Sequence, residues 1–337
     1  NKFYSRKVKP IFLTLQLLLL LIIYLLVMAQ CLKFILNLKL TTRYILSMDG
    51  GGIRTMASIN FLIKLEQSLG VRLCDKFDYF IGTSAGAISC LSLAVKQCDA
   101  IQLKEAWSEE SLEKIMTNSS WETKLGLLQS NPKYTNKGKR KVLDGFYEGL
   151  TMGDAHKPVA VMSYDIEKRE PVLIKSYSDR DKNISLVDAG DASSAAPIYY
   201  PTVKIGDRYL IDGAIVANHP VLHGFVEAKK IYPGDRLKVL SIGTGLNKKP
   251  LNGEDSMGWG IVGWATHDLL SLMMESSLDH ELAADLIGED YLRINSDLGD
   301  VSSQLDDNSD ENIEKINAMG ENWWNEFGTK TLKLLRE

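Results

Sequence analysis

Two strand–turn–helix units follow each other near the start of the chain, and they constrain the fold more than any other feature. The first runs from the apolar residues 44–48 through three glycines into a helical spacing that stops at Gly70. The second runs from a strand-like stretch at 77–81 through a turn at 82–86 into an apolar helix at 87–95. Successive units of this kind are typical of a parallel sheet that is covered by helices on both faces.

Further strands and helices extend this α/β pattern. Strands are predicted at 159–163, 172–174, 203–205, 209–211 and 239–242. The third and fourth of these flank Gly206-Asp207, which indicates a hairpin. Residues 100–150 are predicted to be helical with interruptions, and the basic cluster at 137–141 is interpreted as a solvated loop. In the helical C-terminal third, Asn308 or Ser309 is expected to cap a helix that begins near Asp310.

The turn of the second unit carries the first candidate for chemistry. Gly82, Thr83, Ser84, Ala85 and Gly86 fit the pattern G-x-S-x-G, with a predicted strand before it and a predicted helix after it. A serine on such a sharp turn needs small neighbours, and the amides of the following helix lend positive potential to a developing oxyanion. Taken alone, the pentapeptide is equally compatible with a glycine-rich turn whose serine caps the next helix.

The turn of the first unit is the second candidate. In Asp49-Gly-Gly-Gly-Ile-Arg54, three consecutive backbone amides are free of side-chain hindrance at the end of a strand, which suits an anion or an oxyanion. A dinucleotide-binding loop is disfavoured because Thr55 stands where G-x-G-x-x-G needs glycine. The chain also has no Walker lysine.

A carboxylate at the end of a predicted strand is the third candidate. Asp212 follows the apolar residues 209–211 and precedes Gly213 and Ala214. In this position its side chain can point to the edge of the sheet where the serine turn lies. An ordinary Asp-Gly turn is the alternative interpretation.

The three elements together resemble the patatin-like phospholipase family. Asp-Gly-Gly-Gly-Ile-Arg at 49–54, Gly-Thr-Ser-Ala-Gly at 82–86 and Asp-Gly-Ala at 212–214 match, in this order, its oxyanion loop, nucleophile elbow and catalytic aspartate motif. The segments 193–197 and 241–245, with Tyr200-Pro201, also look like parts of that family. The resemblance covers about residues 42–330, and its departure is Thr55, where many members carry glycine.

The resemblance implies a three-layer α/β/α patatin-like fold with a mainly parallel central sheet. It also implies a lipid acyl hydrolase that works through a Ser-Asp dyad without a cofactor or a metal. Ser84 would be the nucleophile and Asp212 the general base, in a site desolvated enough to raise the pKa of the carboxylate. The amides of Gly50, Gly51 and Gly52 would form the oxyanion hole, and Arg54 would hold the loop or the lipid phosphate. The expected partners are a phospholipid or another glycerolipid and a membrane surface.

A second function class remains open at this stage, a noncatalytic lipid-binding or storage protein on the same fold. None of the five histidines lies in a motif that requires it as a base, and His219 and His223 are interpreted as a helix cap and a surface residue rather than metal ligands. Trp259 and Trp264 are expected either to pack in the core or to line a lipid entrance.

The first 40 residues form a separate basic and hydrophobic leader. They contain six basic residues and no acid, and residues 10–32 carry no charge, which is about the length that spans a bilayer. A single membrane anchor, a cleaved secretory signal and a start-site artefact are the three interpretations, and the last would leave a cytoplasmic protein. The catalytic domain is predicted at 42–330.

Charge argues against a nucleic-acid partner. The net charge is −4, so the chain after the basic leader carries −10. Binding of phosphate backbones needs clustered Lys and Arg on the folded domain. The four cysteines show no C-x-x-C spacing, so neither a disulfide framework nor a zinc site is indicated.

Overall fold

A computed structural model of the chain describes residue 17 and residues 20–28, 41–118, 131–260, 263–264, 272 and 279–336. The chain divides into two units, residues 1–41 and Thr42–Glu337. Residues 20–28 of the first unit are helical, and among the described residues no helix is long and apolar enough to cross a membrane. Most of the leader lies outside the described residues, so its three interpretations stay predictions.

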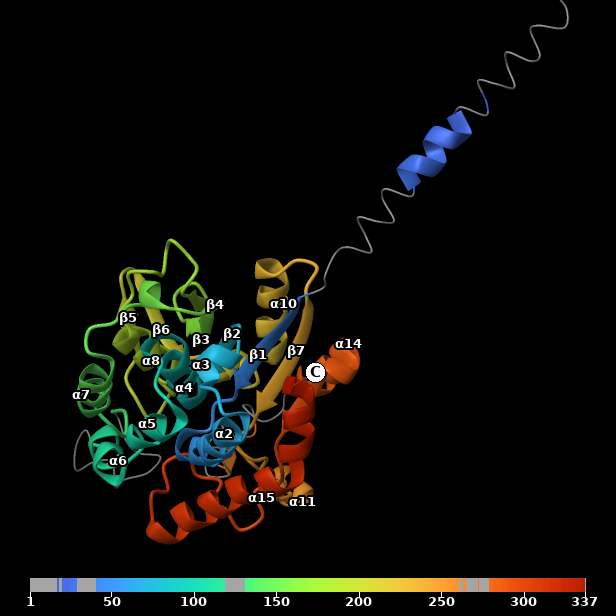
Figure 1. Ribbon diagram of the computed structural model, residues 1–337. Helices are drawn as coiled ribbons and strands as arrows, with labels where there is room; N and C mark the ends of the chain where they lie inside the picture. Colours follow the sequence, from blue (N-terminus) through green and yellow to red (C-terminus); the bar gives the residue numbers. More distant parts are fainter. Residues whose placement is uncertain are drawn as a thin grey trace, which may run out of the picture. The chain divides into compact units, whose positions relative to one another are not determined.

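The second unit is built on one mixed sheet (Figure 1). Its described strands are β1 (Thr42–Met48), β2 (Tyr79–Thr83), β3 (Val159–Asp165), β4 (Glu170–Lys175), β5 (Val203–Ile205), β6 (Arg208–Asp212), β7 (Arg236–Ile242) and β8 (Tyr291–Ile294). They lie in the order β5-β6-β3-β2-β1-β7-β8, and β4 pairs with β3. The five strands from β3 to β8 in this order are parallel to their neighbours, whereas β4, β5 and β6 are antiparallel. The predicted mainly parallel sheet and the hairpin are confirmed.

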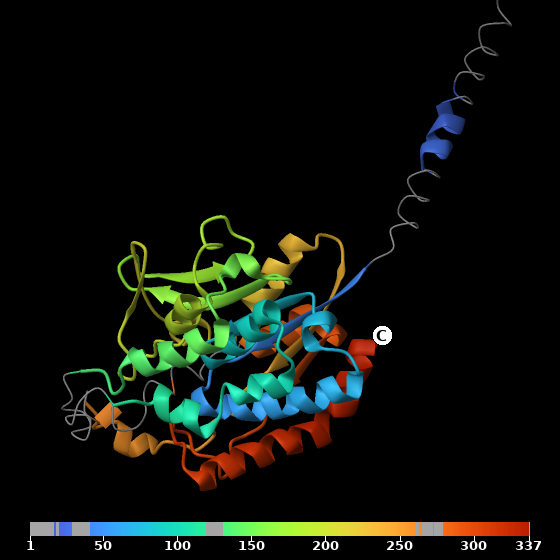
Figure 2. The same cartoon turned by 60° about the vertical axis from the view of Figure 1, so that its left-hand side comes forward.

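Helices cover both faces of the sheet. They are α2 (Thr55–Leu69), α3 (Leu73–Lys76), α4 (Ala85–Leu91), α5 (Ala100–Glu105), α6 (Glu109–Ile115), α7 (Asn136–Tyr147), α8 (Leu186–Ser193), α9 (Ala214–Ala217), α10 (Val221–Ile231), α11 (Gly253–Ser256), α14 (Asp279–Ile287) and α15 (Asp310–Arg336). Helices α2 and α15 run side by side on one face, and α10 and α14 pack together on the other (Figures 1 and 2). The result is the expected three-layer α/β/α architecture.

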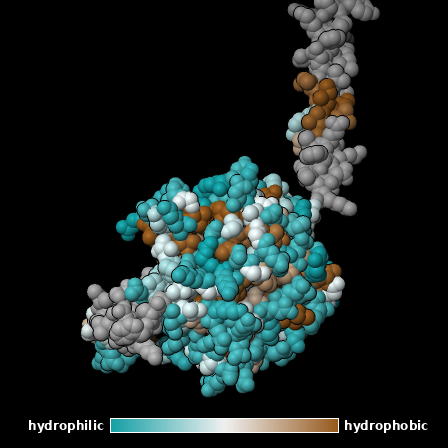
Figure 3. Space-filling view, turned by 90° about the vertical axis from the view of Figure 1, so that its left-hand side faces the viewer, coloured by the Kyte–Doolittle hydropathy of each residue, from teal (hydrophilic) through white to brown (hydrophobic). Residues whose placement is uncertain are grey.

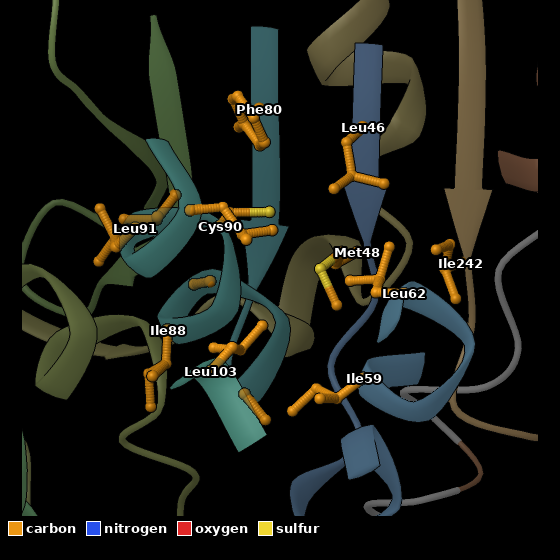
Figure 4. Packing of buried hydrophobic residues seen from close by; sticks show 14 of the residues in the cluster. Leu46, Met48, Ile59, Leu62, Phe80, Ile88, Cys90, Leu91, Leu103 and Ile242 are labelled. Carbon is orange, nitrogen blue, oxygen red and sulfur yellow. The ribbon is translucent and has the colours of Figure 1, made fainter. Parts of the chain in front are cut away.

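Alternation along the strands produces two hydrophobic layers. In β1, Ile45 belongs to the cluster under α10 and α14, whereas Leu46 belongs to the larger cluster on the opposite face. Successive side chains of a strand point to opposite faces, so a sheet covered on both sides needs apolar residues at every position. In the larger cluster, side chains of β1, β2 and β7 meet those of α2, α4 and α5 (Figure 4): Leu46, Phe80, Ile242, Ile59, Cys90 and Leu103.

Of two predicted element boundaries, the start of β2 is shifted and the start of the last helix is confirmed. Strand β2 begins at Tyr79, two residues later than predicted, because the amide of Phe77 still donates to the carbonyl of Leu73 and closes α3. The predicted start of the last helix is confirmed. Helix α15 begins at Asp310, and the Ser309 carbonyl and hydroxyl accept from the first turn.

Candidate active site

Ser84 lies on a strained turn between β2 and α4. Its backbone has φ 54° and ψ −124°, a conformation that costs a non-glycine residue about 1–3 kcal/mol and persists only where its surroundings impose it. The Ser84 amide donates to Ser193 Oγ over 3.0 Å. Glycine is required on both sides, because a Cβ on Gly82 would overlap the backbone of Gly86, and one on Gly86 would overlap the end of β1. The sharp turn expected of G-x-S-x-G is therefore present.

Sheet topology brings Asp212 to this turn. Because β4 occupies one edge of β3, strands β2 and β6 share the other edge. Strand β2 runs parallel to β3 and ends with Thr83 opposite Met162, whereas β6 runs antiparallel and ends with Asp212 opposite Ser163. The C-terminal ends of the two strands thus meet head-on. Ser84 Oγ donates to Asp212 Oδ2 over 2.7 Å.

Burial tunes the Asp212 carboxylate. The side chain is 1% exposed, and this desolvation raises its pKa from 3.8 to about 6, although hydrogen bonds from the Ala214 amide and Ser84 and the charge of Lys139 act in the opposite direction. The Ala214 amide donates to Asp212 Oδ1 over 2.8 Å, so the second oxygen faces Ser84. Gly213 is needed because a Cβ there would overlap Met162. At neutral pH the carboxylate is ionised and can accept a proton from Ser84.

The glycine loop lies beside this pair. Gly51 and Gly52 line the same cavity as Ser84, and within the described part of the chain their amides have no hydrogen-bond partner. The Gly50 amide differs, because it donates to the Asn218 carbonyl over 3.2 Å. Of the three predicted oxyanion donors, two are therefore available to a ligand in this conformation. Arg54 is buried in the short 3₁₀ turn Gly52–Arg54, which fits support of the loop better than contact with a lipid phosphate.

An ionic network that the sequence reasoning missed holds the start of the glycine loop. Both oxygens of Asp49 accept from Arg293, and Oδ2 also lies 2.5 Å from His219 Nδ1. Burial alone would raise the pKa of Asp49, but the charges of Arg293 and His219 outweigh it and hold the pKa at about 2. Arg293 also donates to Ser241 over 2.7 Å. A signal was available, since an arginine inside the apolar run of β8 requires a buried acidic partner.

The interpretation of His219 and of the basic cluster was wrong in part. His219 is 3% exposed and pairs with Asp49, and it does not cap α10, whose N-cap is Pro220. His223, predicted at the surface, is half-buried. Residues 137–141 belong to helix α7 rather than to a loop, and Lys139 is buried. Its ammonium group lies 2.9 Å from Asp191 Oδ1 and donates to Ser194. Desolvation lowers the pKa of Lys139, and the charge of Asp191 counteracts only part of this shift. Asp191 lies on α8, about 50 residues later in the chain, so the sequence did not indicate its pairing with Lys139.

An apolar cavity, part of it open to solvent, lies next to Ser84. Its walls come mainly from α4, α6 and α7 and from the segment after α8. They include Ile88, Trp107, Leu112, Leu143, Phe146 and Tyr200. Such a cavity, with few polar groups and one reactive hydroxyl at its end, suits a hydrocarbon chain attached to an ester. Trp259 and Trp264 do not line it. They are half-buried and pack edge to face, with ring centroids 5.2 Å apart.

The chain is similar to known proteins in sequence and in fold. The family model described as patatin-like phospholipase matches residues 46–224. A cGAMP-activated phospholipase of Pseudomonas aeruginosa is 30% identical over 262 residues, which cover 75% of this chain and 78% of that protein. Patatin-like protein 1 of Arabidopsis thaliana is 30% identical over 332 residues, covering 82% and 80%. In fold, the chain is similar to VipD from Legionella pneumophila, with a TM-score of 0.50 at 13% identity over 87% of this chain and 67% of VipD.

Proposed function

The chain belongs to the patatin-like phospholipase family of lipid hydrolases, and from this premise we propose that it cleaves acyl esters of phospholipids or other glycerolipids through a Ser84–Asp212 dyad. The observation that carries the proposal is the 2.7 Å hydrogen bond from Ser84 Oγ to a buried carboxylate whose pKa lies at about 6. Such a carboxylate is ionised at neutral pH yet more basic than an exposed aspartate.

In the first half of the reaction, Ser84 Oγ attacks the ester carbonyl carbon while its proton moves to Asp212 Oδ2. The oxygen of the tetrahedral intermediate then accepts hydrogen bonds from the amides of Gly51 and Gly52. Donors fixed in this way are worth about 10²–10³ each in rate. When the ester C–O bond breaks, Asp212 returns the proton to the leaving alkoxide, and the acyl group stays on Ser84.

Water then hydrolyses the acyl-enzyme, and Asp212 again acts as the base. Asp212 takes a proton from the water, the hydroxide attacks the acyl carbonyl, and the oxyanion again forms against Gly51 and Gly52. Collapse of this second intermediate releases the fatty acid and returns the proton to Ser84. No histidine is needed, since the hydrogen bond from the Ser84 hydroxyl goes to the carboxylate itself.

The cavity supports an acyl chain as the group bound next to Ser84. Its wall is almost entirely apolar, so burial of a hydrocarbon chain there would be favourable at about 25 cal/mol per Å².

An exposed apolar side chain near this cavity supports a membrane surface as the place of action. Ile198 is 62% exposed and has φ 75°, a conformation that is a genuine outlier for a β-branched residue. Its sequence neighbours Ala196, Tyr199 and Tyr200 line the cavity. The face of the second unit that carries α7 and β5 shows hydrophobic patches between hydrophilic side chains (Figure 3). We propose that Ile198 inserts into lipid beside the cavity.

The test is release of fatty acid from phosphatidylcholine vesicles by the wild-type protein and by Ser84→Ala. We expect hydrolysis by the wild type and at least a 10³-fold loss in the variant, because the nucleophile is missing. Ser92→Ala, at a buried serine of the following helical turn whose hydroxyl bonds the Ile88 carbonyl, is the matched control and should retain activity. Equal turnover by Ser84→Ala and wild type would refute the proposal. An absence of turnover, together with stoichiometric lipid binding, would favour the noncatalytic alternative.

A further inference from the structure

The carbonyl of Gly50 is fixed by two side chains that the reaction itself does not use. Thr244 Oγ1 donates to the Gly50 oxygen over 2.8 Å, and Asn218 Nδ2 donates to it over 3.3 Å. Both side chains are buried, so neither hydrogen bond competes with bulk water. The Gly50 amide in turn donates to the Asn218 carbonyl. Hydrogen bonds therefore fix both the amide and the carbonyl of Gly50.

The orientation of the next amide follows from the planarity of the peptide bond. The carbonyl of Gly50 and the N–H of Gly51 belong to one trans peptide unit, in which the two groups point in opposite directions. Because the carbonyl points at Thr244 and Asn218, the Gly51 N–H must point away from them. Gly51 lines the cavity together with Ser84. The two hydrogen bonds thus fix the direction of this N–H, on a residue that lines the same cavity as Ser84.

The same two side chains also support the loop by contact. A Cβ on Gly51 would overlap the Thr244 side chain, and a Cβ on Gly50 would overlap the Asn218 amide. Rotation of the peptide is therefore opposed by packing as well as by hydrogen bonds. A glycine loop without such support would sample many conformations, since glycine has the largest backbone freedom of all residues.

Asn218 and Thr244 are themselves attached to the elements that carry the dyad. Asn218 ends the short helix α9, which begins two residues after Asp212, and Thr83 Oγ1 donates to the Ala217 carbonyl over 2.7 Å. Thr244 follows β7 through Gly243, whose amide donates to the Ile294 carbonyl over 2.8 Å. The base, the nucleophile turn and the oxyanion loop therefore share one rigid frame.

We propose that Thr244 and Asn218 are positioning residues that orient the Gly51 N–H toward the tetrahedral oxyanion formed at Ser84. The inference rests on the proposed function, because it names what makes that site effective. It goes beyond the dyad and the glycine loop, since neither residue is among those that line the cavity. Their contribution is expected in the transition state and not in the binding of the intact ester.

Thr244→Val tests the proposal because valine keeps the shape of threonine and removes only the hydroxyl donor. We expect kcat for a soluble short-chain ester to fall about 10- to 100-fold with KM nearly unchanged, less than the loss of a whole donor. The inhibition constant of a trifluoromethyl ketone, which forms a reversible tetrahedral adduct with an active serine, should rise by a similar factor. Thr244→Ser restores a hydroxyl and should recover most of the activity.

Thr331→Val is the matched control for the loss of a buried threonine hydroxyl. Thr331 is fully buried in α15, where its hydroxyl donates to the Phe327 carbonyl, so this variant should keep wild-type kcat. Equal kcat and equal ketone affinity for Thr244→Val and wild type would refute the positioning role while leaving the dyad intact. A wild type without Ser84-dependent turnover would instead refute the proposed function, and the inference with it. If Thr244→Val fails to fold, Asn218→Ala is expected to show the same selective loss of kcat, and normal kcat in that variant would refute the proposal equally.

Discussion

Replacement of Asp212 by asparagine is expected to abolish hydrolysis and to stabilise the folded protein. The aspartate is fully buried, and asparagine has nearly the same shape without the charge. Asparagine can also accept from the Ala214 amide and pair with Ser84 Oγ, so both hydrogen bonds of the carboxylate have a counterpart. The change removes a buried charge and keeps the packing.

The size of the effect follows from the pKa of Asp212. Its pKa is about 6 in the folded protein and 3.8 without the fold, so the folded state binds the proton more tightly. Ionisation of this group therefore opposes folding at high pH, and stability is regained as the pH falls through 6 toward 3.8. A shift of this size corresponds to about 3 kcal/mol at pH 8, falling to about 1 kcal/mol at pH 4.5.

The assay is urea unfolding of wild type and Asp212→Asn at both pH values. The variant should be more stable by up to about 3 kcal/mol at pH 8, and this advantage should shrink by about 2 kcal/mol at pH 4.5. Asp181→Asn is the comparison at a buried aspartate that pairs with Arg180 and Arg208, and it should destabilise the protein because it leaves those cations unpaired. An Asp212→Asn protein less stable than wild type at pH 8, or a difference independent of pH, would refute the reasoning.

Three further substitutions follow from the site. Gly51→Ala should lower kcat about 10²- to 10³-fold because its methyl group overlaps Thr244 and displaces an oxyanion donor, and a normal kcat would remove this loop from the mechanism. Val142→Trp narrows the cavity, so the rate of hydrolysis of a palmitoyl ester should fall at least tenfold relative to the rate for a butyryl ester. An equal loss of rate for the two esters would show that acyl chains bind elsewhere. Ile198→Asn tolerates the positive φ of this position and removes the apolar side chain, so hydrolysis of vesicles should fall several-fold while hydrolysis of a soluble ester stays constant. Unchanged hydrolysis of vesicles would contradict the insertion of Ile198 into lipid.

The hydrogen-bonded pair of Ser84 and Asp212 could be predicted from the sequence because each partner stands in a local motif. A serine flanked by glycines between a strand and a helix has few structural solutions, and Asp212 at the end of an apolar strand had to reach an edge of the sheet. The sequence did not indicate how the two would meet. That depends on β2 and β6, which lie over 120 residues apart in the chain, each pairing with the same edge of β3 from opposite directions.

The partners within the supporting network could not be predicted because they are far apart in the chain: an arginine in an apolar strand indicates a buried acidic partner but not which one. Asp49 pairs with Arg293, 244 residues away, and Thr244 bonds the Gly50 carbonyl, 194 residues away. Lys139 stood in a run of basic residues that normally indicates a solvated surface. Only the fold places Asp191 Oδ1 2.9 Å from the Lys139 ammonium group, and this ion pair partly compensates for the burial of the lysine. The residues proposed to act on the substrate stand in sequence motifs, whereas the residues proposed to position them could be identified only from the fold.

Labelling by a fluorophosphonate tests the proposed Ser84–Asp212 dyad most directly. The rate of labelling is measured from pH 4.5 to 9, and the modified residue is mapped by mass spectrometry. The proposed dyad predicts a single adduct on Ser84 whose rate of formation rises with one ionisation near pH 6, the pKa of Asp212, and then stays level. Labelling of another residue, or a rate on Ser84 that does not change between pH 5 and 7, would contradict it.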